Sequence, residues 1–324
     1  MKIEKSLDIK WDKVLLVWFW GFKNMWDELI LLWNIKLLKE QWKKIFVVSQ
    51  DNDRLKTFLS KEIDCSDITF VDELPRWFRS SIKYLKKNWL KQLKLFFKID
   101  TVILWWWEIL TEESSHSYHY RFRSIWPSLF FKKNLYIMWW VQIPKEKLNK
   151  KLFNFTLKRT SKIFCRDFDG VEELKKYGFE NVEFLMDTSY FVRDDWKKYK
   201  KDSNKKYIVI NINNKGKQFI DDLKIEAKKY VNQWYDCYFV PVCTWWTDDD
   251  NRFFDWLKKD FPNIEICKWD DNFEKFLQFL WGAKCVISSR LHLYLISEYI
   301  WLKTINFPYQ KKILKMQKVI EKIK

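Results

Sequence analysis

The sequence predicts an α/β protein built from two Rossmann-like domains that face each other across a cleft. Three observations predict this fold class. Short apolar runs rich in Val, Ile, Leu and Phe recur along the chain, a turn and a helical stretch follow each run, and the whole pattern restarts after a polar, lysine-rich segment. Strands that are apolar throughout and alternate with helices are typical of a parallel sheet covered on both faces.

The elements follow in order. In the first half, the expected strands cover residues 14–17, 45–49, 101–104, 135–138 and 161–165. The lysine-rich segment over residues 197–206 is the expected linker. After it, strands are expected at 207–210, 237–242, 264–267, 285–288 and 303–307, with helices at 272–280, 291–300 and 311–324. The expected domains are therefore 1–195 and 206–310, followed by a terminal amphipathic helix over 311–324.

Tryptophan stands where glycine is expected. The chain has 22 Trp and 5 Gly, whereas glycine makes up about 7% of an ordinary domain. Trp105, Trp106 and Trp107 directly follow an apolar run, and a strand-to-turn junction favours glycine. Our hypothesis is that most of these positions are UGA codons read as glycine in the source organism; a genuinely Trp-rich protein is the alternative. An aromatic residue is ordinary at four positions: Trp77, Trp126, Trp196 and Trp234.

The composition indicates a cytoplasmic protein without a bilayer-spanning segment, because neither a signal peptide nor a long apolar stretch is found. The six cysteines show no metal-ligand spacing and are expected to be reduced thiols. The formal net charge of +17 comes from dispersed lysines. It fits a solvated surface, or attraction to phosphorylated substrates, an anionic membrane or nucleic acid.

The first of four post-strand segments covers residues 18–28. With Trp18 and Trp26 taken as glycine it becomes G-F-x-G-F-K-N-M-G-D-E, while Trp20 is compatible with a genuine aromatic. Such a turn offers backbone N–H groups to an anion or a sugar hydroxyl. Its two acids also suit the positive end of a helix dipole without any further role. The candidate binding residues of this segment are Gly21, Asn24, Trp26, Asp27 and Glu28.

Three further segments follow expected strands. Trp105, Trp106 and Trp107 precede Glu108 and become G-G-G-E after recoding. Arg166 emerges directly after a strand. Arg290 and His292 open the helix that follows the strand ending at Ser288, and Lys312 lies downstream.

This ordered series resembles the polysaccharide pyruvyl transferase family, from about Val14 to Lys312. The family shares a G-x-x-G-F-x-N-x-G-D-E start, a G-G-G, an Arg-Asp after a strand, and S-x-R-L-H with a later Lys. The resemblance implies a fold like the B-type glycosyltransferases (GT-B). It also implies transfer of an enolpyruvyl unit from phosphoenolpyruvate, the co-substrate, to a cell-wall or exopolysaccharide sugar, with no other cofactor. The family often has a small residue at the position of Glu108, so the resemblance does not extend to acceptor recognition there.

The chemistry of phosphoenolpyruvate explains the residue types. Its phosphate and carboxylate require fixed cations, and arginine pairs with either group in a bidentate manner. Arg290 lies at a helix N-terminus, which is itself positive, and the resemblance adds Arg166 and Lys312. His292 is the expected proton donor to the enol methylene, since imidazole titrates near neutrality. A histidine that merely packs at the helix start is the alternative.

Other interpretations remain open. His116 and His119 form an H-x-x-H pair without a third ligand at recognisable spacing, so no metal site is expected; their segment suits either the acceptor side of the cleft or a surface loop. A GT-B glycosyltransferase using a nucleotide sugar is the nearest rival. A nucleic-acid-binding protein would exploit the charge and the 19% aromatic content, but it leaves Arg290 and His292 unused, so no nucleic acid partner is expected. A lipid-linked acceptor, with peripheral contact at the inner face of the membrane, stays open.

Overall fold

The computed structural model describes two compact units within the chain. It describes residues 9–21, 24–72, 94–106, 128–139, 143–201, 205–244, 249–267 and 272–323. The N-terminal unit comprises Met1–Gly21 and Asn34–Asp187, and the C-terminal unit comprises Phe22–Trp33 and Thr188–Lys324. Helix α1 (Met25–Glu40) therefore contributes its first turns to one unit and its remainder to the other.

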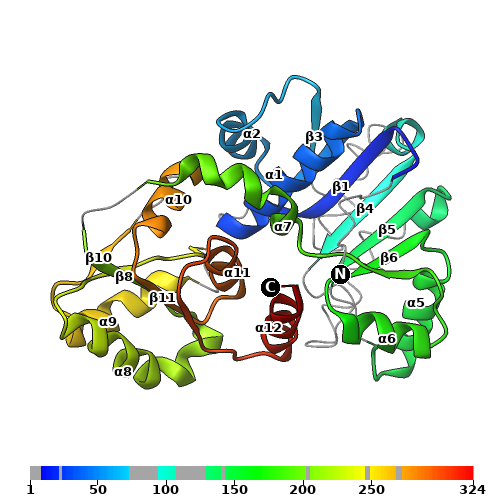
Figure 1. Cartoon of the computed structure of the whole chain (residues 1–324). Coiled ribbons are helices and arrows are strands. Elements are labelled where there is room, and N and C mark those ends of the chain that lie inside the picture. The colour runs from blue at the N-terminus through cyan, green and yellow to red at the C-terminus, as the bar shows by residue number, and fades with distance from the viewer. Residues whose placement is uncertain are drawn as a thin grey trace. The chain divides into compact units, whose positions relative to one another are not determined.

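The N-terminal unit is built on a seven-stranded sheet in the order β3-β2-β1-β4-β5-β6-β7, and its strand pairs are parallel (Figure 1). The order reverses between β1 and β4, which makes that point the crevice of a doubly wound sheet. The strands are β1 (Lys13–Trp20), β2 (Lys44–Ser49), β3 (Ile68–Asp72), β4 (Thr101–Trp106), β5 (Asn134–Trp139), β6 (Lys162–Cys165) and β7 (Val182–Phe184). Its helices include α2 (Asn52–Ser60), α5 (Lys147–Leu157) and α6 (Phe168–Lys176).

The C-terminal unit repeats this plan with five parallel strands in the order β10-β9-β8-β11-β12. Figure 1 shows helices α8 and α9 on one side of the sheet and α11 on the other. The strands are β8 (Tyr207–Asn211), β9 (Asp236–Phe239), β10 (Glu265–Ile266), β11 (Cys285–Ser288) and β12 (Thr304–Asn306). The helices are α7 (Thr188–Val192), α8 (Ile220–Val231), α9 (Phe254–Asp260), α10 (Phe273–Trp281), α11 (Leu291–Tyr299) and α12 (Lys311–Ile323), with 3₁₀ turns η1 (Arg193–Tyr199), η2 (Asn214–Phe219) and η3 (Asp250–Phe253).

The core of the C-terminal unit explains why its strands are apolar throughout. Ile208, Ile210, Phe239 and Ile287 are fully buried in one cluster between the sheet and its helices. Covering both faces of a sheet leaves no solvent side for polar residues. The restart of the apolar pattern after the lysine-rich segment thus reflects a second sheet.

The ten expected strands all form, and two more join the first sheet. Strands β3 and β7 escaped prediction because they are short and only partly buried. The expected turn at Trp18 is wrong: β1 continues to Trp20, which pairs with Ser49 after a shift in register. The turn comes instead at Gly21, whose φ is +88°, and a Cβ there would lie 2.7 Å from the amide nitrogen of Asp51. Likewise β4 continues through Trp105 and Trp106, beyond the expected strand end at Leu104.

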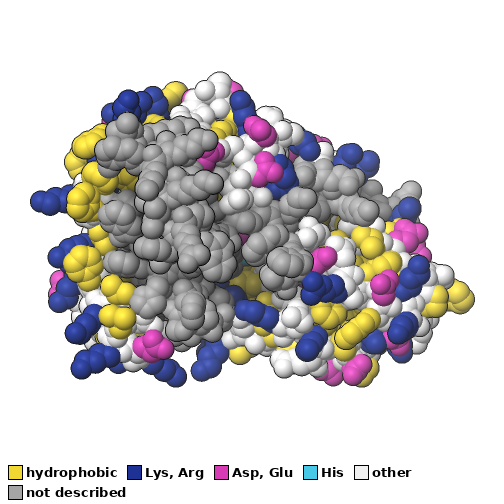
Figure 2. Space-filling view, turned by 180° about the vertical axis from the view of Figure 1, so that it is seen from behind, with side chains coloured by type: hydrophobic (Ala, Val, Ile, Leu, Met, Phe, Trp, Pro, Cys, Tyr) yellow, Lys and Arg dark blue, Asp and Glu magenta, His cyan; other side chains and the backbone are white. Residues whose placement is uncertain are grey.

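The surface and the cysteines agree with the composition. Figure 2 shows Lys and Arg side chains scattered over one face and interspersed with acidic ones. All six cysteines are free thiols, and five of them are buried. Within the part of the chain that the structure describes, we find no helix whose length and hydropathy would let it cross a bilayer.

Candidate functional site

The carboxyl ends of β8 and β11 form the crevice of the C-terminal sheet, because the strand order reverses between them. Asn211 ends β8 and Ser288 ends β11; both are fully buried, and the Ser288 hydroxyl donates to the Asn211 side-chain oxygen over 3.3 Å. Ser289 then approaches the η2 turn so closely that a Cβ on Gly216 would lie 2.6 Å from its side chain. These contacts fix the backbone that leads into Arg290.

Arg290 is held by a buried carboxylate. It is the residue before α11, and its guanidinium forms an ion pair with Asp250. The Arg290 Nε donates to Asp250 Oδ2 over 3.3 Å, and Nη2 donates to Oδ1. Asp250 is fully buried, whereas the Arg290 side chain keeps 13% of its surface exposed. The pair therefore sits at the boundary of the crevice with the arginine outward.

The Asp250 carboxylate is itself anchored by three further donors. Its Oδ2 accepts from the amide nitrogens of Val242 (3.0 Å) and Cys243 (3.2 Å) and from the Asn211 side chain (3.1 Å). Burial raises the pKa of the Asp250 carboxyl above its ordinary value, and Arg290 with these donors opposes that rise. Every one of these bonds uses the carboxylate as an acceptor, so the pair behaves as one rigid ionic unit.

The first turn of α1 packs onto the same crevice. Asn24 forms an isolated antiparallel bridge with Cys243, the residue whose amide nitrogen holds Asp250. The Asn24 side-chain oxygen accepts from the Trp26 amide over 3.2 Å and so begins the helix. Asp27 and Glu28 are buried in this first turn, where the helix dipole favours negative charge. The first and the last sequence motifs thus meet in space.

His292 lies beside Trp26. It is the second residue of α11 and is 8% exposed. Its imidazole lies 5.3 Å from the Trp26 ring, centroid to centroid. Trp26 also packs edge-on against Phe276 of α10. The imidazole that was singled out as the proton donor is therefore covered on one side by this indole.

In the N-terminal unit, Arg166 is fully buried directly after β6, and its Nη1 lies 3.8 Å from the Oδ2 of Asp187, which is equally buried. Asp167 caps α6 by accepting from the Gly170 amide over 2.8 Å. The sequence interpretation missed both Asp187 and Asp250. Asp187 lies three residues beyond the end of β7, a strand that was not predicted, and Asp250 lies eleven residues beyond the end of β9, so position after a strand marked neither acid.

The remaining candidate residues fall in several places. Gly21 makes the turn after β1, Trp105 is fully buried within β4, and Trp106 pairs with Trp139 in the neighbouring strand. Lys312 is half-buried in the first turn of α12. Four predicted residues lie outside the described ones: Trp107, Glu108, His116 and His119. Among the residues that are described, no group of His, Cys, Asp and Glu is arranged to hold a metal ion.

The family model of the polysaccharide pyruvyl transferases matches residues 27–297, which is most of the chain. The chain belongs to the polysaccharide pyruvyl transferase family. The resemblance expected from the four post-strand segments is thereby confirmed, and the family makes the protein a transferase. A search of curated proteins found no match.

Solved structures similar to this polysaccharide pyruvyl transferase family member show the fold. A UDP-N-acetylglucosamine 2-epimerase from Rickettsia bellii has a TM-score of 0.57 at 12% identity, covering 96% of this chain and 88% of the other. The Neisseria meningitidis UDP-GlcNAc 2-epimerase, bound to UDP-GlcNAc, has a TM-score of 0.55 at 11% identity, with 96% and 90% covered. A glycosyltransferase from Rickettsia africae has a TM-score of 0.53 at 13% identity, with 92% and 79% covered. At these identities only the fold is shared, and it is the expected GT-B-like class.

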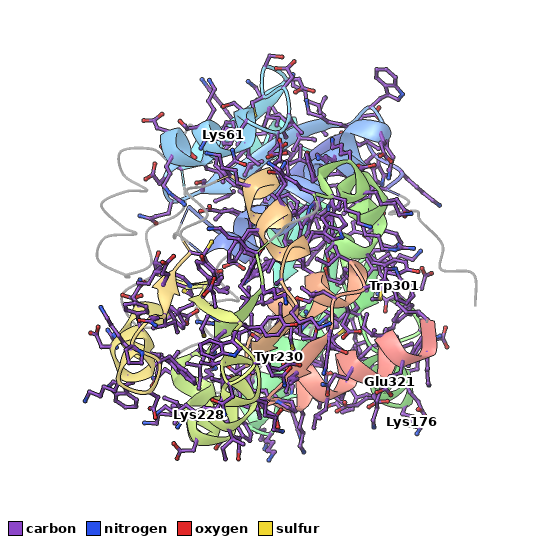
Figure 3. All side chains as sticks on the ribbon, turned by 60° about the vertical axis from the view of Figure 1, so that its left-hand side comes forward. Lys61, Lys176, Lys228, Tyr230, Trp301 and Glu321 are labelled. Carbon is purple, nitrogen blue, oxygen red and sulfur yellow. The ribbon has the colours of Figure 1, made fainter. Side chains whose placement is uncertain are left out.

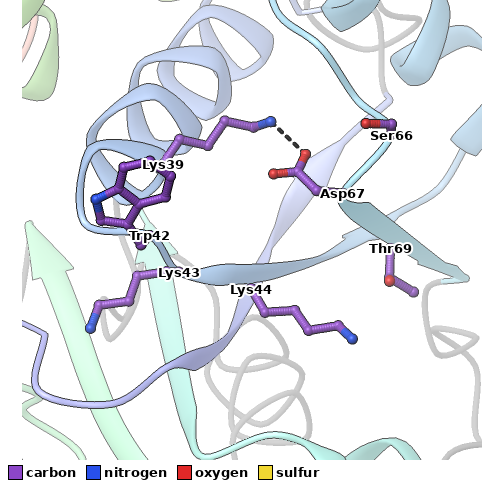
Figure 4. A pocket seen from close by; sticks show the side chains of 7 residues that line it. All are labelled: Lys39, Trp42, Lys43, Lys44, Ser66, Asp67 and Thr69. Carbon is purple, nitrogen blue, oxygen red and sulfur yellow. Dashed lines mark hydrogen bonds and ion pairs between the residues drawn. The ribbon is translucent and has the colours of Figure 1, made fainter.

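A surface pocket lies at the amino ends of two strands of the N-terminal sheet, opposite to their carboxyl ends (Figure 4). Lys44 begins β2 and Asp67 directly precedes β3, so the pocket is at the amino ends of these strands. An ion pair joins Lys39 and Asp67 across it, as the dashed line in Figure 4 marks. Ligands of doubly wound sheets bind at the carboxyl ends, so this pocket is not the candidate active site of the family member.

Proposed function

We propose that this family member transfers an enolpyruvyl group from phosphoenolpyruvate to a sugar and closes a cyclic pyruvate ketal. One observation carries the proposal: an arginine bound by a buried aspartate precedes a histidine by two residues, at the start of a helix that follows a crevice strand of a Rossmann-like sheet. That combination suits a small dianion whose carbon skeleton must be protonated.

The anion-binding groups are Arg290 and the start of α11. Arg290 offers a bidentate donor edge to carboxylate or phosphate oxygens, and the first amides of α11 add the positive end of a helix dipole. The family resemblance adds Arg166 and Lys312 to the anion-binding residues of this proposal. Phosphoenolpyruvate is then a co-substrate, and the proposal invokes no further cofactor.

His292 protonates the terminal methylene carbon of phosphoenolpyruvate, and C2 becomes an oxocarbenium-like centre. One sugar hydroxyl attacks C2 and gives its proton to the deprotonated imidazole of His292. Phosphate departs with the electron pair of its C2–O bond. A second hydroxyl of the same sugar adds to C2 and gives its proton to the departing phosphate, which leaves a ring that carries a methyl and a carboxylate.

The acceptor is a saccharide of a cell-wall or exopolysaccharide, and the cytoplasm is the proposed location. Gly21, Asn24, Asp27 and Glu28 contribute to its binding in this proposal, together with the segment over residues 105–108. A lipid-linked acceptor would bring the basic surface into transient contact with the membrane. The rival function, glycosyl transfer from a nucleotide sugar, draws on the similarity to enzymes solved with UDP-GlcNAc.

Phosphate release in the presence of phosphoenolpyruvate and candidate sugars tests the proposal. We expect His292→Gln to abolish turnover while binding of phosphoenolpyruvate stays measurable by calorimetry, because the anion-binding Arg290 remains. Near-normal turnover of His292→Gln would refute the assignment of the proton donor. Stabilisation of the protein against heat by nucleotide sugars and not by phosphoenolpyruvate would favour the rival function.

A further inference from the structure

We propose that Asp250 is a positioning residue that sets the orientation of Arg290 for phosphoenolpyruvate; this inference rests on the proposed function. No candidate residue of the sequence motifs plays this part. Asp250 lies at the start of η3, forty positions before its partner, and joins it only through the fold.

The contacts leave the carboxylate little freedom. Two backbone amides and the Asn211 side chain converge on Asp250 Oδ2, so its position is fixed by β8 and by the chain after β9. Arg290 Nε and Nη2 bind this fixed group side by side. A guanidinium is planar, so two bonds along one edge determine the direction of the whole group.

The direction of the third guanidinium nitrogen, Nη1, is therefore fixed as well. With its Nε and Nη2 edge turned to Asp250, the Arg290 guanidinium points Nη1 away from the buried carboxylate. Asp250 is fully buried, whereas 13% of the Arg290 side chain is exposed, so Arg290 is the member of the pair that solvent and a dissolved anion can reach. Asp250 thereby presents a preorganised cation to the substrate anion.

The neighbouring Asp249 provides a matched control. It caps η3 by accepting from the amide and the side chain of Asn251 over 3.0 and 2.8 Å. The side chain of Asp249 therefore caps η3, whereas the side chain of Asp250 binds Arg290. Replacing either acid by asparagine removes one negative charge within the same turn.

Steady-state kinetics of Asp250→Asn and Asp249→Asn separate positioning from structure. We expect Asp250→Asn to raise KM for phosphoenolpyruvate by on the order of tenfold to a hundredfold, as small misplacements of binding groups do, with KM for the sugar unchanged. Asp249→Asn should leave both KM values within about twofold. In an Arg290→Lys background the Asp250→Asn change should add little, because both changes act through one group. Equal effects of the two asparagine variants, or additivity in the Arg290→Lys background, would overturn the inference.

A second readout needs no substrate. The Arg290 Nε–H resonance, assigned by its loss in Arg290→Lys, should be sharp in the wild type and in Asp249→Asn. In Asp250→Asn it should shift or broaden. If the wild type neither binds phosphoenolpyruvate nor releases phosphate, the proposed function fails, while this resonance still reports whether Asp250 orients Arg290. An unchanged resonance in Asp250→Asn would refute the positioning role.

A different observation carries a second inference. Three tryptophans end helices in the left-handed backbone region, where glycine is usual: Trp42 (φ 57°), Trp234 (φ 67°) and Trp301 (φ 61°). Lys132 is the only other non-glycine residue with positive φ among those described, and Gly178 occupies the equivalent place after α6 with φ 98°.

The hydrogen bonds identify the motif. In each case the next amide donates to the carbonyl five residues back: Lys43 to Leu38 (3.2 Å), Tyr235 to Tyr230 (3.2 Å) and Leu302 to Ser297 (2.9 Å), as Phe179 does to Leu174 (3.1 Å) beside Gly178. This is the Schellman helix end, which requires positive φ. The three indoles are 94%, 91% and 78% exposed, so packing does not explain them. Trp42 rims the pocket of Figure 4, and Trp301 is labelled in Figure 3.

We infer that the authentic polypeptide carries glycine at positions 42, 234 and 301, and also at 26. The Trp26 indole nitrogen is buried without a hydrogen-bond partner among the described residues, and glycine there would open the space beside His292. Trp234, which the sequence suggested to be a genuine aromatic, now joins the glycine group. Trp196 does not: it is buried against Trp33, Phe273 and Tyr299, and its indole nitrogen, unlike that of Trp26, is not among the buried atoms that lack a hydrogen-bond partner.

Peptide mass spectrometry of the protein from its source cells tests this inference. We expect glycine at positions 26, 42, 234 and 301, and tryptophan at 196. Tryptophan at 42, 234 and 301 in the native protein would overturn it. As a second measurement, Trp26→Gly should bind phosphoenolpyruvate more tightly than the protein with tryptophan at position 26. Weaker binding would contradict the view that glycine opens space beside His292.

Discussion

A side chain in the left-handed region costs free energy unless packing or hydrogen bonding compensates for it. For an L-residue the cost is about 1–2 kcal/mol, because Cβ crowds the following carbonyl oxygen. The indole of Trp301 is 78% exposed, so burial offsets little of this cost. At this scale the composition pointed to glycine, but it could not say which positions need it, because positive φ is a property of the helix ends.

Replacing Trp301 by glycine should therefore stabilise the chain as written by about 1 kcal/mol, measured by urea unfolding. Trp196→Gly is the control, since Trp196 is 1% exposed among aromatic neighbours. It should destabilise by about 3–5 kcal/mol, as large-to-small changes in a core do. Destabilisation by Trp301→Gly would contradict the strain argument.

The buried pair of Arg166 and Asp187 is the second feature at the residue scale. Both side chains are fully buried, and removing one member of such a pair deprives the other buried charge of its counter-ion. We expect Asp187→Ala to destabilise the N-terminal unit by about 3–5 kcal/mol. Glu172→Gln, which breaks an exposed pair with Lys176, should change stability by less than about 0.5 kcal/mol. If chemical denaturation gave equally small losses of stability for Asp187→Ala and Glu172→Gln, the buried ion pair would not be what stabilises this region.

At the scale of elements, the sequence predicted strands well because burial on both faces leaves an unbroken apolar run, as in β8, where all of Tyr207–Asn211 is buried. It failed where a strand is short and half-exposed, as in β7.

The candidate site was half predicted. Arg290 and His292 share one helix start and so could be found together, whereas Asp250 reaches Arg290 only through the packing of η3 against β8 and β11.

The turn between β8 and α8 depends on one glycine. A Cβ at Gly216 would lie 2.6 Å from both side-chain atoms of Ser289. Gly216→Ala should therefore destabilise the protein by about 1–3 kcal/mol, as overpacking does, and should weaken phosphoenolpyruvate binding because Ser289 precedes Arg290. Gly170→Ala is the control, since its closest approach, 3.3 Å to the Asp167 side chain, is milder. Thermal unfolding and calorimetry check both effects; a tolerated Gly216→Ala would show that the η2 turn can move away.

At the scale of the whole molecule, stability should fall at alkaline pH because of buried neutral acids. Burial raises the pKa of Cys237 from 9.0 to about 12 and that of Tyr207 from 10.0 to about 12. Both groups ionise more readily in the unfolded chain. The contribution of Cys237 is therefore complete below about pH 9 and is lost as the pH rises toward 12, at about 1.4 kcal/mol per pH unit. The contribution of Tyr207 is lost in the same direction above about pH 10.

Urea unfolding at about pH 8 and about pH 10.5 measures this loss. Cys237→Val should flatten the pH dependence by about 2 kcal/mol over that interval, since the variant has no thiol to ionise. A slope that is identical in the wild type and in Cys237→Val would disprove the contribution of this thiol.

Helix α1 divides between the two units: Phe22–Trp33 groups with the C-terminal half and the chain from Asn34 with the N-terminal half. No single cut in the polypeptide therefore yields two complete bodies. A fragment starting at Thr188 would lack Asn24 and Trp26, the residues that cover Cys243 and His292. Split versions of the enzyme would therefore need both fragments to carry a copy of this helix.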